Sequence, residues 1–347
     1  MTSKVLWLSG ANGFVGSNVL LEVLKKTTWR VICPTTSLHH GSQERLNRVL
    51  KAAGNDAKRV KVVRCDLSQP FTQNVFGGRD WHPHYIWNIA SESHVDRSLE
   101  DPVPFVENNV KLILNVLEYA KEVEPEIFLQ MSTDEVFGPA PEGYSHHEWD
   151  KIKPSNPYSA SKAAQEAIAY SYWRAYNVPV VLTNTMNLIA PGPGYQSSEK
   201  FVPLVVSKVA NEEEVQIHST PEGVSGSRCW IDVRDFADAW LFLTERLAGD
   251  PGIRYYPSMP EELHRYNIVG PEASNLKVAQ MIADEMGEAL YYRMVNFHDS
   301  RPGHDPRYSL DGSKLEEFGW TPSRTLEETI RDIVNWYLDN PEAIGLE

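Results

Sequence analysis

Residues 131–138 of this chain read Met-Ser-Thr-Asp-Glu-Val-Phe-Gly and place a hydroxyl, Thr133, directly before two carboxylates, Asp134 and Glu135. Two neighbouring carboxyl groups in a closed apolar site cannot both ionise cheaply, because burial and mutual repulsion both disfavour the second charge. One of them is therefore expected to stay protonated near neutral pH, so that the pair offers an acid and a base to one substrate. An arbitrary Asp-Glu pair is more often part of an exposed turn, and the pattern needs support from elsewhere in the chain.

A tyrosine and a lysine stand four residues apart at Tyr158 and Lys162, and Tyr158 is the only one of the 15 tyrosines that lysine follows at this interval. A spacing of four puts both side chains on one face of a helix. The ammonium is then expected to lower the phenol pKa and to reach a cofactor ribose. Such a tyrosine can take a proton from a hydroxyl while hydride leaves. Thr133, Asp134 and Glu135 complete the predicted catalytic set.

A glycine-rich turn lies between an apolar stretch, residues 4–8, and an amphipathic run, residues 15–24. Glycines in such a turn allow the backbone to approach a pyrophosphate and to aim helix N–H groups at it. A turn without a ligand is the alternative, but the strand before it and the helix after it favour a dinucleotide site. The turn residues predicted to bind the cofactor are Gly10, Asn12, Gly13, Phe14, Val15 and Gly16.

The second apolar stretch ends in Cys-Pro-Thr-Thr-Ser, residues 33–37, without a carboxylate that could bind an adenosine ribose. A group of polar side chains could instead surround a 2′-phosphate, which modestly favours NADP over NAD. These side chains are Thr35, Thr36, Ser37, His39 and Arg45.

An acidic residue, Asp66, follows the third apolar stretch and is predicted to contact the adenine amino group, with Leu67 beside it. An equally good interpretation of Asp66 is a turn former or helix cap.

Apolar, strand-like runs alternate with helical stretches up to about residue 185, which is typical of a parallel sheet covered on both faces. Strands are expected at 4–8, 30–33, 60–65, 84–89, 126–131 and 178–185. Helices are expected to begin near Phe14, Gln43, Val103 and Tyr158. The pattern predicts an α/β fold, a Rossmann doubly wound parallel sheet with a smaller C-terminal lobe.

Pro/Gly-rich segments begin after Asn187, so we expect a dinucleotide-binding domain over residues 1–187. Residues 188–347 are expected to form mainly a substrate-binding lobe, with some segments returning to the first domain. A final helix is predicted near the C-terminus, where Thr325 and Glu328 form a capping-box pattern.

The chain has 347 residues and a formal net charge of −14, which argues against nucleic acid as a partner. No apolar run reaches the length of a membrane span, and a strand is expected almost at the first residue, so neither a membrane segment nor a signal peptide is predicted. Three unpaired cysteines, Cys33, Cys65 and Cys229, favour a reducing cytoplasm. No metal site is predicted, and the pairs 39–40 and 146–147 are interpreted as plain surface histidines.

These motifs together resemble the extended short-chain dehydrogenase/reductases, and more closely their nucleoside-diphosphate-glucose 4,6-dehydratases, above all those that act on dTDP-glucose. The resemblance covers nearly the whole chain. It rests on the glycine turn, on Tyr158 and Lys162, and on residues 90–98, 132–138, 199–203 and 301–308.

The resemblance implies a reaction without net redox change. Tyr158 deprotonates the sugar O4 while hydride passes from C4 to NAD(P)+, and Thr133 orients O4. Glu135 then removes the C5 proton, protonated Asp134 donates to the departing C6 hydroxyl, and the hydride returns to C6. The product is an NDP-4-keto-6-deoxyhexose, and dTDP-glucose is the expected substrate. The cofactor is expected to stay bound and be recycled.

Further residues gain a role from the resemblance alone. Ala90 and Ser91 are expected beside the cofactor. Residues expected to bind the nucleotide sugar are Ser93, Asn187, Lys200, Phe201, Arg228, Asn267, Arg301 and His304. The two arginines suit phosphate oxygens, which they can bind with a bidentate fork. The chain departs from the family at residues 188–190, where Leu-Ile-Ala replaces Asn-Tyr-Gly.

Two other functions are compatible with the fold. A sugar-nucleotide 4-epimerase or a UDP-glucuronate decarboxylase would need Tyr158 and Lys162 but not the Asp-Glu pair. A non-catalytic NADP(H)-binding sensor would need only the glycine turn. A homodimer is also expected, because the helices over 103–121 and 158–176 are apolar on more than one face. The apolar residues concerned are Leu112, Leu114, Val116, Ile168, Tyr172 and Trp173.

Overall fold

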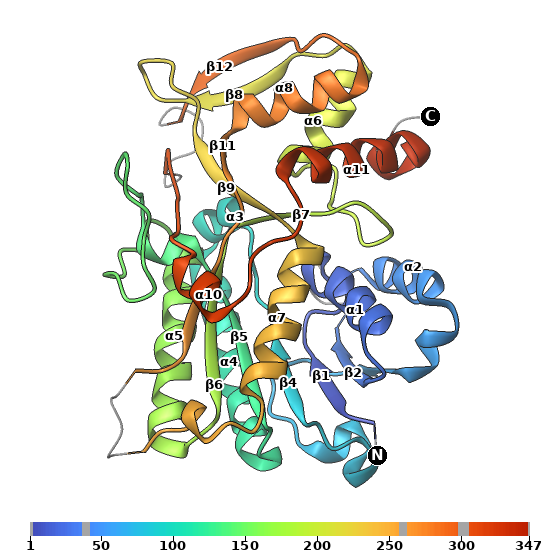
Figure 1. Ribbon diagram of the computed structural model, residues 1–347, viewed down its shortest axis with the longest axis vertical. Helices are drawn as coiled ribbons and strands as arrows, with labels where there is room; N and C mark the ends of the chain where they lie inside the picture. Colours follow the sequence, from blue (N-terminus) through green and yellow to red (C-terminus); the bar gives the residue numbers. More distant parts are fainter. Residues whose placement is uncertain (1–2, 37–41, 257–261, 298–304, 346–347) are drawn as a thin grey trace.

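The larger part of the molecule is built on a parallel sheet of seven strands, in the order β10-β6-β5-β4-β1-β2-β3 (Figure 1). The computed structural model describes residues 3–36, 42–256, 262–297 and 305–345. The strands are β1 (Val5–Leu8), β2 (Arg30–Thr35), β3 (Val60–Arg64), β4 (Tyr85–Asn88), β5 (Ile127–Thr133), β6 (Val180–Thr185) and β10 (Arg265–Ile268).

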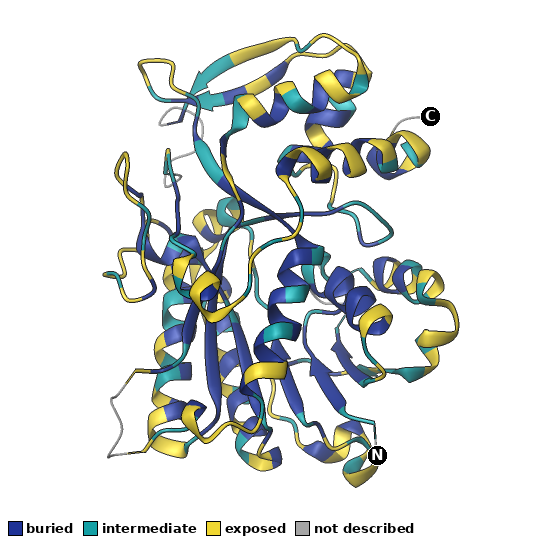
Figure 2. Cartoon of the chain, in the orientation of Figure 1, coloured by how far each residue is buried: buried dark blue, intermediate teal, exposed yellow. Residues whose placement is uncertain are grey.

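Helices cover both faces of this sheet, as the alternating pattern predicted. Side chains alternate along β1, so that Leu6 and Leu8 pack in one core and Val5 and Trp7 in another. The first core is covered by α1 (Phe14–Lys26), α2 (Gln43–Ala53) and α7 (Val233–Leu247). The second is covered by α4 (Pro102–Val123) and α5 (Pro157–Tyr176). Figure 2 shows most of the strands between these layers as buried, whereas the edge strand β3 is partly exposed. The doubly wound Rossmann fold is therefore confirmed.

Shorter helices complete this part of the chain. They are α3 (Val95–Glu100), α10 (Ser313–Phe318) and the 3-10 turns at Gly54–Arg59, Gln73–Phe76, Gly78–Trp81, Asp134–Phe137 and Pro251–Ile253.

All six predicted strands are present, with ends displaced by a few residues. The fifth runs to Thr133 rather than Met131, so Asp134 is the first residue of the 3-10 turn that follows it. The sheet also contains β10, a seventh strand from the C-terminal part of the chain, which pairs parallel with β6. Some segments of residues 188–347 were expected to return to the first domain, but the sequence pattern did not locate this strand.

The smaller lobe lies above the sheet in Figure 1 and has its own core. Its strands are β7 (Asn187–Ile189), β8 (Val215–Ser219), β9 (Ser227–Asp232), β11 (Glu272–Ser274) and β12 (Tyr292–Asn296). Its helices are α6 (Phe201–Ala210), α8 (Asn275–Met286), α11 (Leu326–Asp339) and the 3-10 turn Pro341–Ile344. The predicted capping box is present, because Thr325 accepts from the Glu328 amide and Glu328 accepts from the Thr325 amide.

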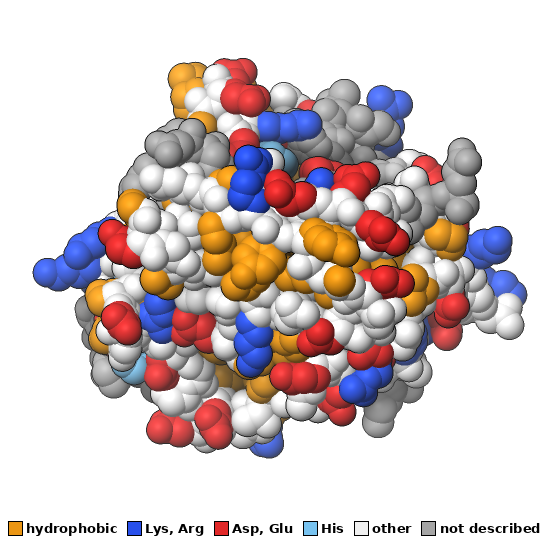
Figure 3. Space-filling view, turned by 90° about the horizontal axis from the view of Figure 1, so that it is seen from above, with side chains coloured by type: hydrophobic (Ala, Val, Ile, Leu, Met, Phe, Trp, Pro, Cys, Tyr) orange, Lys and Arg blue, Asp and Glu red, His pale blue; other side chains and the backbone are white. Residues whose placement is uncertain are grey.

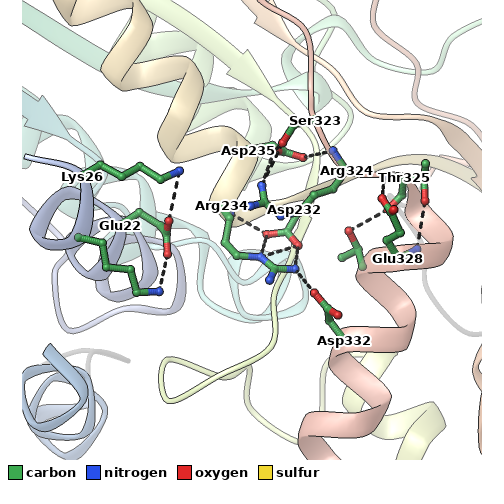
Figure 4. A network of polar contacts seen from close by, with 12 residues as sticks. Glu22, Lys26, Asp232, Arg234, Asp235, Ser323, Arg324, Thr325, Glu328 and Asp332 are labelled. Atoms are coloured by element: carbon green, nitrogen blue, oxygen red, sulfur yellow. Dashed lines mark hydrogen bonds and ion pairs between the residues drawn. The ribbon is translucent and has the colours of Figure 1, made fainter.

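Charged side chains join the lobe to helix α7 (Figure 4). Asp232 caps α7 by accepting from the Arg234 amide at 2.7 Å. The Arg234 guanidinium pairs with Asp232 and also with Asp332 of α11, at 2.6 and 2.7 Å. One residue further along α7's first turn, Asp235 pairs with Arg324 at 2.5 Å. The lobe is thus tied to α7 by ion pairs in which two carboxylates, Asp232 and Asp235, are buried.

The face of the lobe in Figure 3 carries acidic and basic side chains interspersed, with hydrophobic side chains between them. Among the described residues, none of the helices has the length and apolar character needed to cross a membrane.

Most of the apolar residues that suggested a dimer face instead lie in the core of one chain. Leu112, Val116, Tyr172 and Trp173 are buried between the sheet and helices α4 and α5. Leu114 is 36% exposed. The apolar character of these helices is therefore explained largely by packing within the chain.

Candidate active site

The glycine turn between β1 and α1 brings backbone segments very close together. Gly10 has φ 71°, in the left-handed region that favours glycine. A Cβ at Gly16 would lie 2.2 Å from the Gly10 carbonyl oxygen, and one at Gly10 would lie 3.1 Å from the Ala90 nitrogen. Helix α1 begins at Phe14 after Gly13, which offers no side-chain cap. The first N–H groups of α1 therefore point out of a cradle made of backbone alone, which fits a dinucleotide pyrophosphate.

The polar group expected around a 2′-phosphate is arranged differently. Arg45 is buried, and its guanidinium donates to the carbonyl oxygens of Tyr195 and Asn12 at 3.2 and 3.3 Å. Asn12 also donates to the Thr36 carbonyl at 3.0 Å. Thr35 is buried at the end of β2. The Arg45 charge is thus used to fix the glycine turn and the Pro/Gly-rich loop.

Two predicted cofactor contacts lie outside the residues that the structure describes, namely Ser37 and His39. Asp66 accepts from the Ser68 amide and hydroxyl at 2.9 and 2.8 Å, which is the turn-forming arrangement. Leu67 is buried, and its carbonyl accepts from Asn115 at 3.0 Å.

The loop after β4 is held next to the glycine turn. The Ser9 hydroxyl accepts from the amide of Ala90 at 2.9 Å. Further along the loop, Ser91 donates to the Glu92 carbonyl. Asn109 of α4 fixes that same residue by accepting from its amide and donating to its carbonyl, at 2.8 and 3.0 Å. Ala90 and Ser91 thus lie on a braced loop beside the expected pyrophosphate cradle.

The acid/base pair lies where β5 ends and a 3-10 turn begins. The Thr133 hydroxyl donates to Asp134 Oδ1 at 3.0 Å and accepts from the Glu135 amide at 3.3 Å. Glu135 Oε2 accepts from the side-chain amide of Asn156 at 3.2 Å. Asp134 is 6% exposed. The pair is therefore not an exposed turn, which was the alternative interpretation.

Burial raises the pKa of both carboxyl groups towards neutrality. The pKa of Asp134 is raised to about 6, mainly by loss of water, although the Thr133 hydrogen bond and the charge of Arg228 oppose the shift. Loss of water and repulsion by Asp134 raise the pKa of Glu135 to about 7, opposed by Asn156 and Arg228. Near pH 6.5 the pair consequently shares about one proton.

Tyr158 and Lys162 lie on the first turns of α5, directly beside this pair. The phenol is hydrogen-bonded to Thr133, and burial, then the charge of Glu135, raises the Tyr158 pKa above its usual value. Lys162 is not among the groups that shift the phenol pKa, so the expected lowering by its ammonium is not found. Lys162 donates to the Met131 carbonyl and to Gln165, both at 2.8 Å. Burial lowers the Lys162 pKa to about 8, opposed by the charge of Glu166.

Arg228, which was predicted to bind the substrate, lies near the acid/base pair together with two residues that were not assigned, Asp305 and Tyr308. The Arg228 guanidinium donates to the carbonyls of Asp305 and Pro306 at 2.7 and 2.9 Å and lies 4.6 Å from the Tyr308 ring centroid. The Tyr308 hydroxyl donates to Asp305 at 2.8 Å. Burial, then the charge of Glu135, raises the Tyr308 pKa. Asp305 and Tyr308 stand in the motif over residues 301–308, which was the available signal.

The other predicted substrate residues have varied surroundings. Asn187 is partly exposed, and its side chain donates to the Cys229 carbonyl at 3.5 Å. Phe201 packs 5.9 Å from Trp230, ring centroid to ring centroid. Lys200 lies close enough to His94 for its charge to lower the His94 pKa, although burial has the larger effect. Ser93 is exposed.

Asn267 lies apart from this group and is fully buried. Its amide donates to the carbonyls of His146 and Asp311 at 3.0 and 2.9 Å, so it holds two loops against β10. Arg301 and His304 lie outside the described residues.

His94 and His146 are more buried than plain surface histidines. The buried Nδ1 of His94 has no hydrogen-bond partner among the described residues. His146 stacks on Phe137 with ring centroids 5.3 Å apart and contacts Asp150 at 3.0 Å. Within the described parts of the chain, no three His, Cys, Asp or Glu side chains are grouped as metal ligands.

The Rossmann sheet, the backbone cradle, the Tyr158/Lys162 helix and the lobe closing over them define an extended short-chain dehydrogenase/reductase. Within that class of proteins, the Asp-Glu pair beside Tyr158 is the feature that indicates a sugar-nucleotide dehydratase. A family model described as GDP-mannose 4,6 dehydratase matches residues 8–333, and the chain belongs to this family.

Relatives of known activity match along almost the entire chain. The dTDP-glucose 4,6-dehydratase of Haemophilus influenzae is 32% identical over 360 residues, covering 97% of this chain and 98% of that protein. The dTDP-glucose 4,6-dehydratase 1 of Escherichia coli K12 is 30% identical over 368 residues, covering 98% of this chain and 94% of that protein.

Solved structures agree with this assignment. DesIV, a dTDP-glucose 4,6-dehydratase of Streptomyces venezuelae solved with NAD bound, matches with a TM-score of 0.81 and 27% identity, covering 97% of this chain and 98% of that one. The UDP-glucose 4-epimerase of Bifidobacterium longum has the same TM-score, 0.81, at 22% identity, covering 98% of this chain and 100% of that one. That second likeness concerns the fold alone.

Proposed function

We propose that this protein is a sugar-nucleotide 4,6-dehydratase, a hydro-lyase that converts an NDP-hexose, with dTDP-glucose as the expected substrate, into the NDP-4-keto-6-deoxyhexose. The observation that carries the proposal is the pair of a buried Asp134 and a partly buried Glu135 beside Thr133 and Tyr158, with pKa values raised to about 6 and about 7. An elimination of water needs one group that takes a proton and another that gives one, and this pair holds one proton between them near neutral pH.

The residues of the chain divide the reaction between them. Tyr158 takes the proton of the sugar O4 as a phenolate, a form that needs a nearby positive charge because burial and Glu135 raise the pKa of the phenol, and Thr133, which is hydrogen-bonded to Tyr158, orients O4. A bound nicotinamide would accept a hydride and later return it. Oxidation at C4 makes the C5 proton acidic, and Glu135 as carboxylate removes it. Asp134 as carboxylic acid donates to the C6 hydroxyl as it departs, so the productive form is the one that carries the shared proton on Asp134, the group with the lower pKa of the two.

Lys162 fits the cofactor side of this arrangement. Its amine is held by Met131 and Gln165 and, with a pKa of about 8, remains mostly protonated at neutral pH. A cation at this place would stabilise the phenolate of Tyr158 and donate to a ribose hydroxyl.

The pair distinguishes this function from the nearest alternatives. A 4-epimerase or a UDP-glucuronate decarboxylase uses the Tyr and Lys but has no elimination to assist. A non-catalytic NADP(H) sensor would gain nothing from burying two carboxylates, which costs free energy.

We further propose that the cofactor is NAD or NADP, bound at the backbone cradle of Gly10, Gly13 and Gly16. Sequence analysis favours NADP, because β2 ends without a carboxylate. Two observations favour NAD. Arg45 is already used to hold the glycine turn, and a related dehydratase structure contains NAD. Releasing the cofactor by denaturation and identifying it by mass distinguishes the two.

A homodimer in the cytoplasm, with a division into domains near Asn187, remains part of the proposal. The three cysteines are free and buried, which suits a reducing compartment. If light scattering at dilute concentration showed only monomer, the proposed homodimer would be wrong.

The direct test is to incubate the purified protein separately with dTDP-, UDP-, CDP- and GDP-hexoses, without added reductant. The expected result is loss of one water from one of the nucleotide sugars, with a 4-keto-6-deoxy product detected by mass and NMR. The substrate that reacts also identifies the nucleotide base. An epimer or a decarboxylated sugar would contradict the roles given to Asp134 and Glu135. No turnover of any sugar would favour the sensor.

A further inference from the structure

Glu166 and Arg265 form an ion pair buried beneath the candidate site. Arg265 Nη2 lies 2.8 Å from Glu166 Oε2, and the two side chains are only 2% and 3% exposed. Glu166 lies on α5 one turn beyond Lys162, and Arg265 is the first residue of β10. Removing two charges from water generally costs as much as their attraction returns, so stability alone is a poor reason for such a pair.

Asn184 on β6 connects this pair to the catalytic turn. Its side-chain oxygen accepts from Arg265 Nε at 2.8 Å, and its amide donates to Glu166 Oε1 at 2.8 Å. The same amide donates to the Thr133 carbonyl at 2.9 Å. Asn184 is fully buried. The start of the Asp134–Phe137 turn is thus fixed by a side chain that the ion pair itself holds in place.

The other end of the turn rests on the same guanidinium. Arg265 lies 5.0 Å from the ring centroid of Phe137 and 5.3 Å from that of Trp149, distances at which a cation is attracted to a ring. Asp134 and Glu135 therefore lie between Thr133 and Phe137. Arg265 is connected to Thr133 through Asn184 and contacts the ring of Phe137 directly.

We propose that Glu166, Asn184 and Arg265 are positioning residues that hold the Asp134–Phe137 turn against the Tyr158/Lys162 helix. The proposal rests on the proposed function, since it is the alignment of two proton-transfer sets on one sugar that requires such a fixed turn. Proton transfer depends steeply on distance between donor and acceptor, so a small displacement of the turn lowers the rate without removing any catalytic group. The charge of Glu166 also opposes the lowering of the Lys162 pKa.

The test removes the pair as a unit. The double variant Glu166→Leu/Arg265→Met avoids leaving one buried charge unpaired, which would endanger folding. A second variant, Asn184→Val, keeps the ion pair and removes the contact with Thr133. Amide hydrogen exchange of the peptide over residues 131–138 is measured by mass spectrometry, with kcat and KM of the expected dehydration. Thermal unfolding verifies that each variant is folded.

The double variant Asp235→Leu/Arg324→Met is the matched control, because it removes another ion pair with a buried carboxylate, at the junction with the lobe (Figure 4). We expect exchange over 131–138 to be at least about fivefold faster in the network variants than in the control. We expect kcat to fall about 10- to 100-fold with KM changed less than about threefold, as for misplacement of a reacting group. Exchange and kcat equal to those of the control would overturn the proposal.

Failure of the proposed function would be seen separately. The unmodified protein would then convert none of the nucleotide sugars, while the exchange comparison would still show whether the network holds the turn.

Discussion

The side-chain amide of Asn156 donates to Glu135 Oε2 at 3.2 Å, and so links the expected base to the start of the helix that carries Tyr158. The same Asn156 side chain accepts from the Ser159 amide at 2.8 Å and caps helix α5. One residue thus sets the distance between the groups that act on O4 and on C5. It also favours the ionised form of Glu135, because an N–H donor lowers a carboxyl pKa.

Asn156→Ala is expected to raise the pKa of Glu135 above about 7, since the donor that opposes the effect of burial is lost. The base must be ionised and the acid protonated, so activity should follow a bell with apparent pKa values near 6 and 7. In the variant the alkaline limb, which follows the higher pKa of Glu135, moves to higher pH, and the maximum falls. The measurement is kcat/KM against pH. Thr325→Ala, which removes the cap of α11, should cost about 1 kcal/mol of stability and leave the profile in place.

Asp134→Asn and Glu135→Gln are each expected to lower kcat by a factor of about 10²–10⁴, the usual contribution of one placed proton transfer. Binding of the cofactor, followed by its fluorescence or by its recovery with the protein, should be retained. In Glu135→Gln, exchange of the C5 hydrogen with D2O should be lost together with the product. A variant that still exchanged C5 at the wild-type rate would show that another residue is the base.

The raised pKa of Glu135 has a consequence for stability. Between its ordinary value of 4.5 and about 7, the folded protein holds a proton that the unfolded chain has lost. The contribution of this group to stability is therefore present below pH 4.5 and is lost as pH rises through 7. Glu135→Gln should be more stable than wild type at pH 8, by on the order of 1–3 kcal/mol, and should lose this advantage towards pH 4.5.

Thermal or urea unfolding at both pH values measures this difference. Glu317→Gln, an exposed carboxylate on α10, serves as the control and should change little at either pH. Equal stabilities of wild type and Glu135→Gln at pH 8 would contradict the raised pKa.

Gly16→Ala tests the backbone cradle. The new Cβ would lie 2.2 Å from the Gly10 carbonyl oxygen, so β1 and α1 would have to separate. We expect destabilisation of about 1–3 kcal/mol, as for overpacked sites, and loss of bound cofactor. Gly287→Asn provides the contrast, since this position has φ 71° but open space around it, and asparagine tolerates that conformation. The measurement is the cofactor content of the purified variants together with their Tm.

Local sequence patterns were sufficient to locate the candidate site residues and most of the fold. The spacing of Tyr158 and Lys162 predicts two side chains on one helix face, proposed here as catalytic, because a helix has a fixed pitch. Alternating apolar runs identified all six predicted strands, because buried parallel strands are apolar along their whole length. Asn156 was not assigned from the sequence, although it caps α5 and donates to Glu135.

Other features depend on segments that are distant in the chain. Strand β10 has four residues and no distinctive pattern, yet it brings Arg265 to Glu166, 99 residues earlier. The surroundings of Arg228 come from Asp305 and Tyr308, nearly 80 residues further on. A side chain's neighbours across such separations are determined by packing, which a local pattern does not contain.

The sequence by itself determined which groups this protein can use: a backbone cradle, a Tyr/Lys pair and two adjacent carboxyls after a threonine. Only the tertiary structure decided their ionisation, because a pKa depends on burial and on charges that arrive from elsewhere in the chain. The phenol of Tyr158 shows the difference: its spacing from Lys162 was readable from the sequence, whereas the effects of burial and of Glu135 on its pKa arise only when the end of β5 and helix α5 come together.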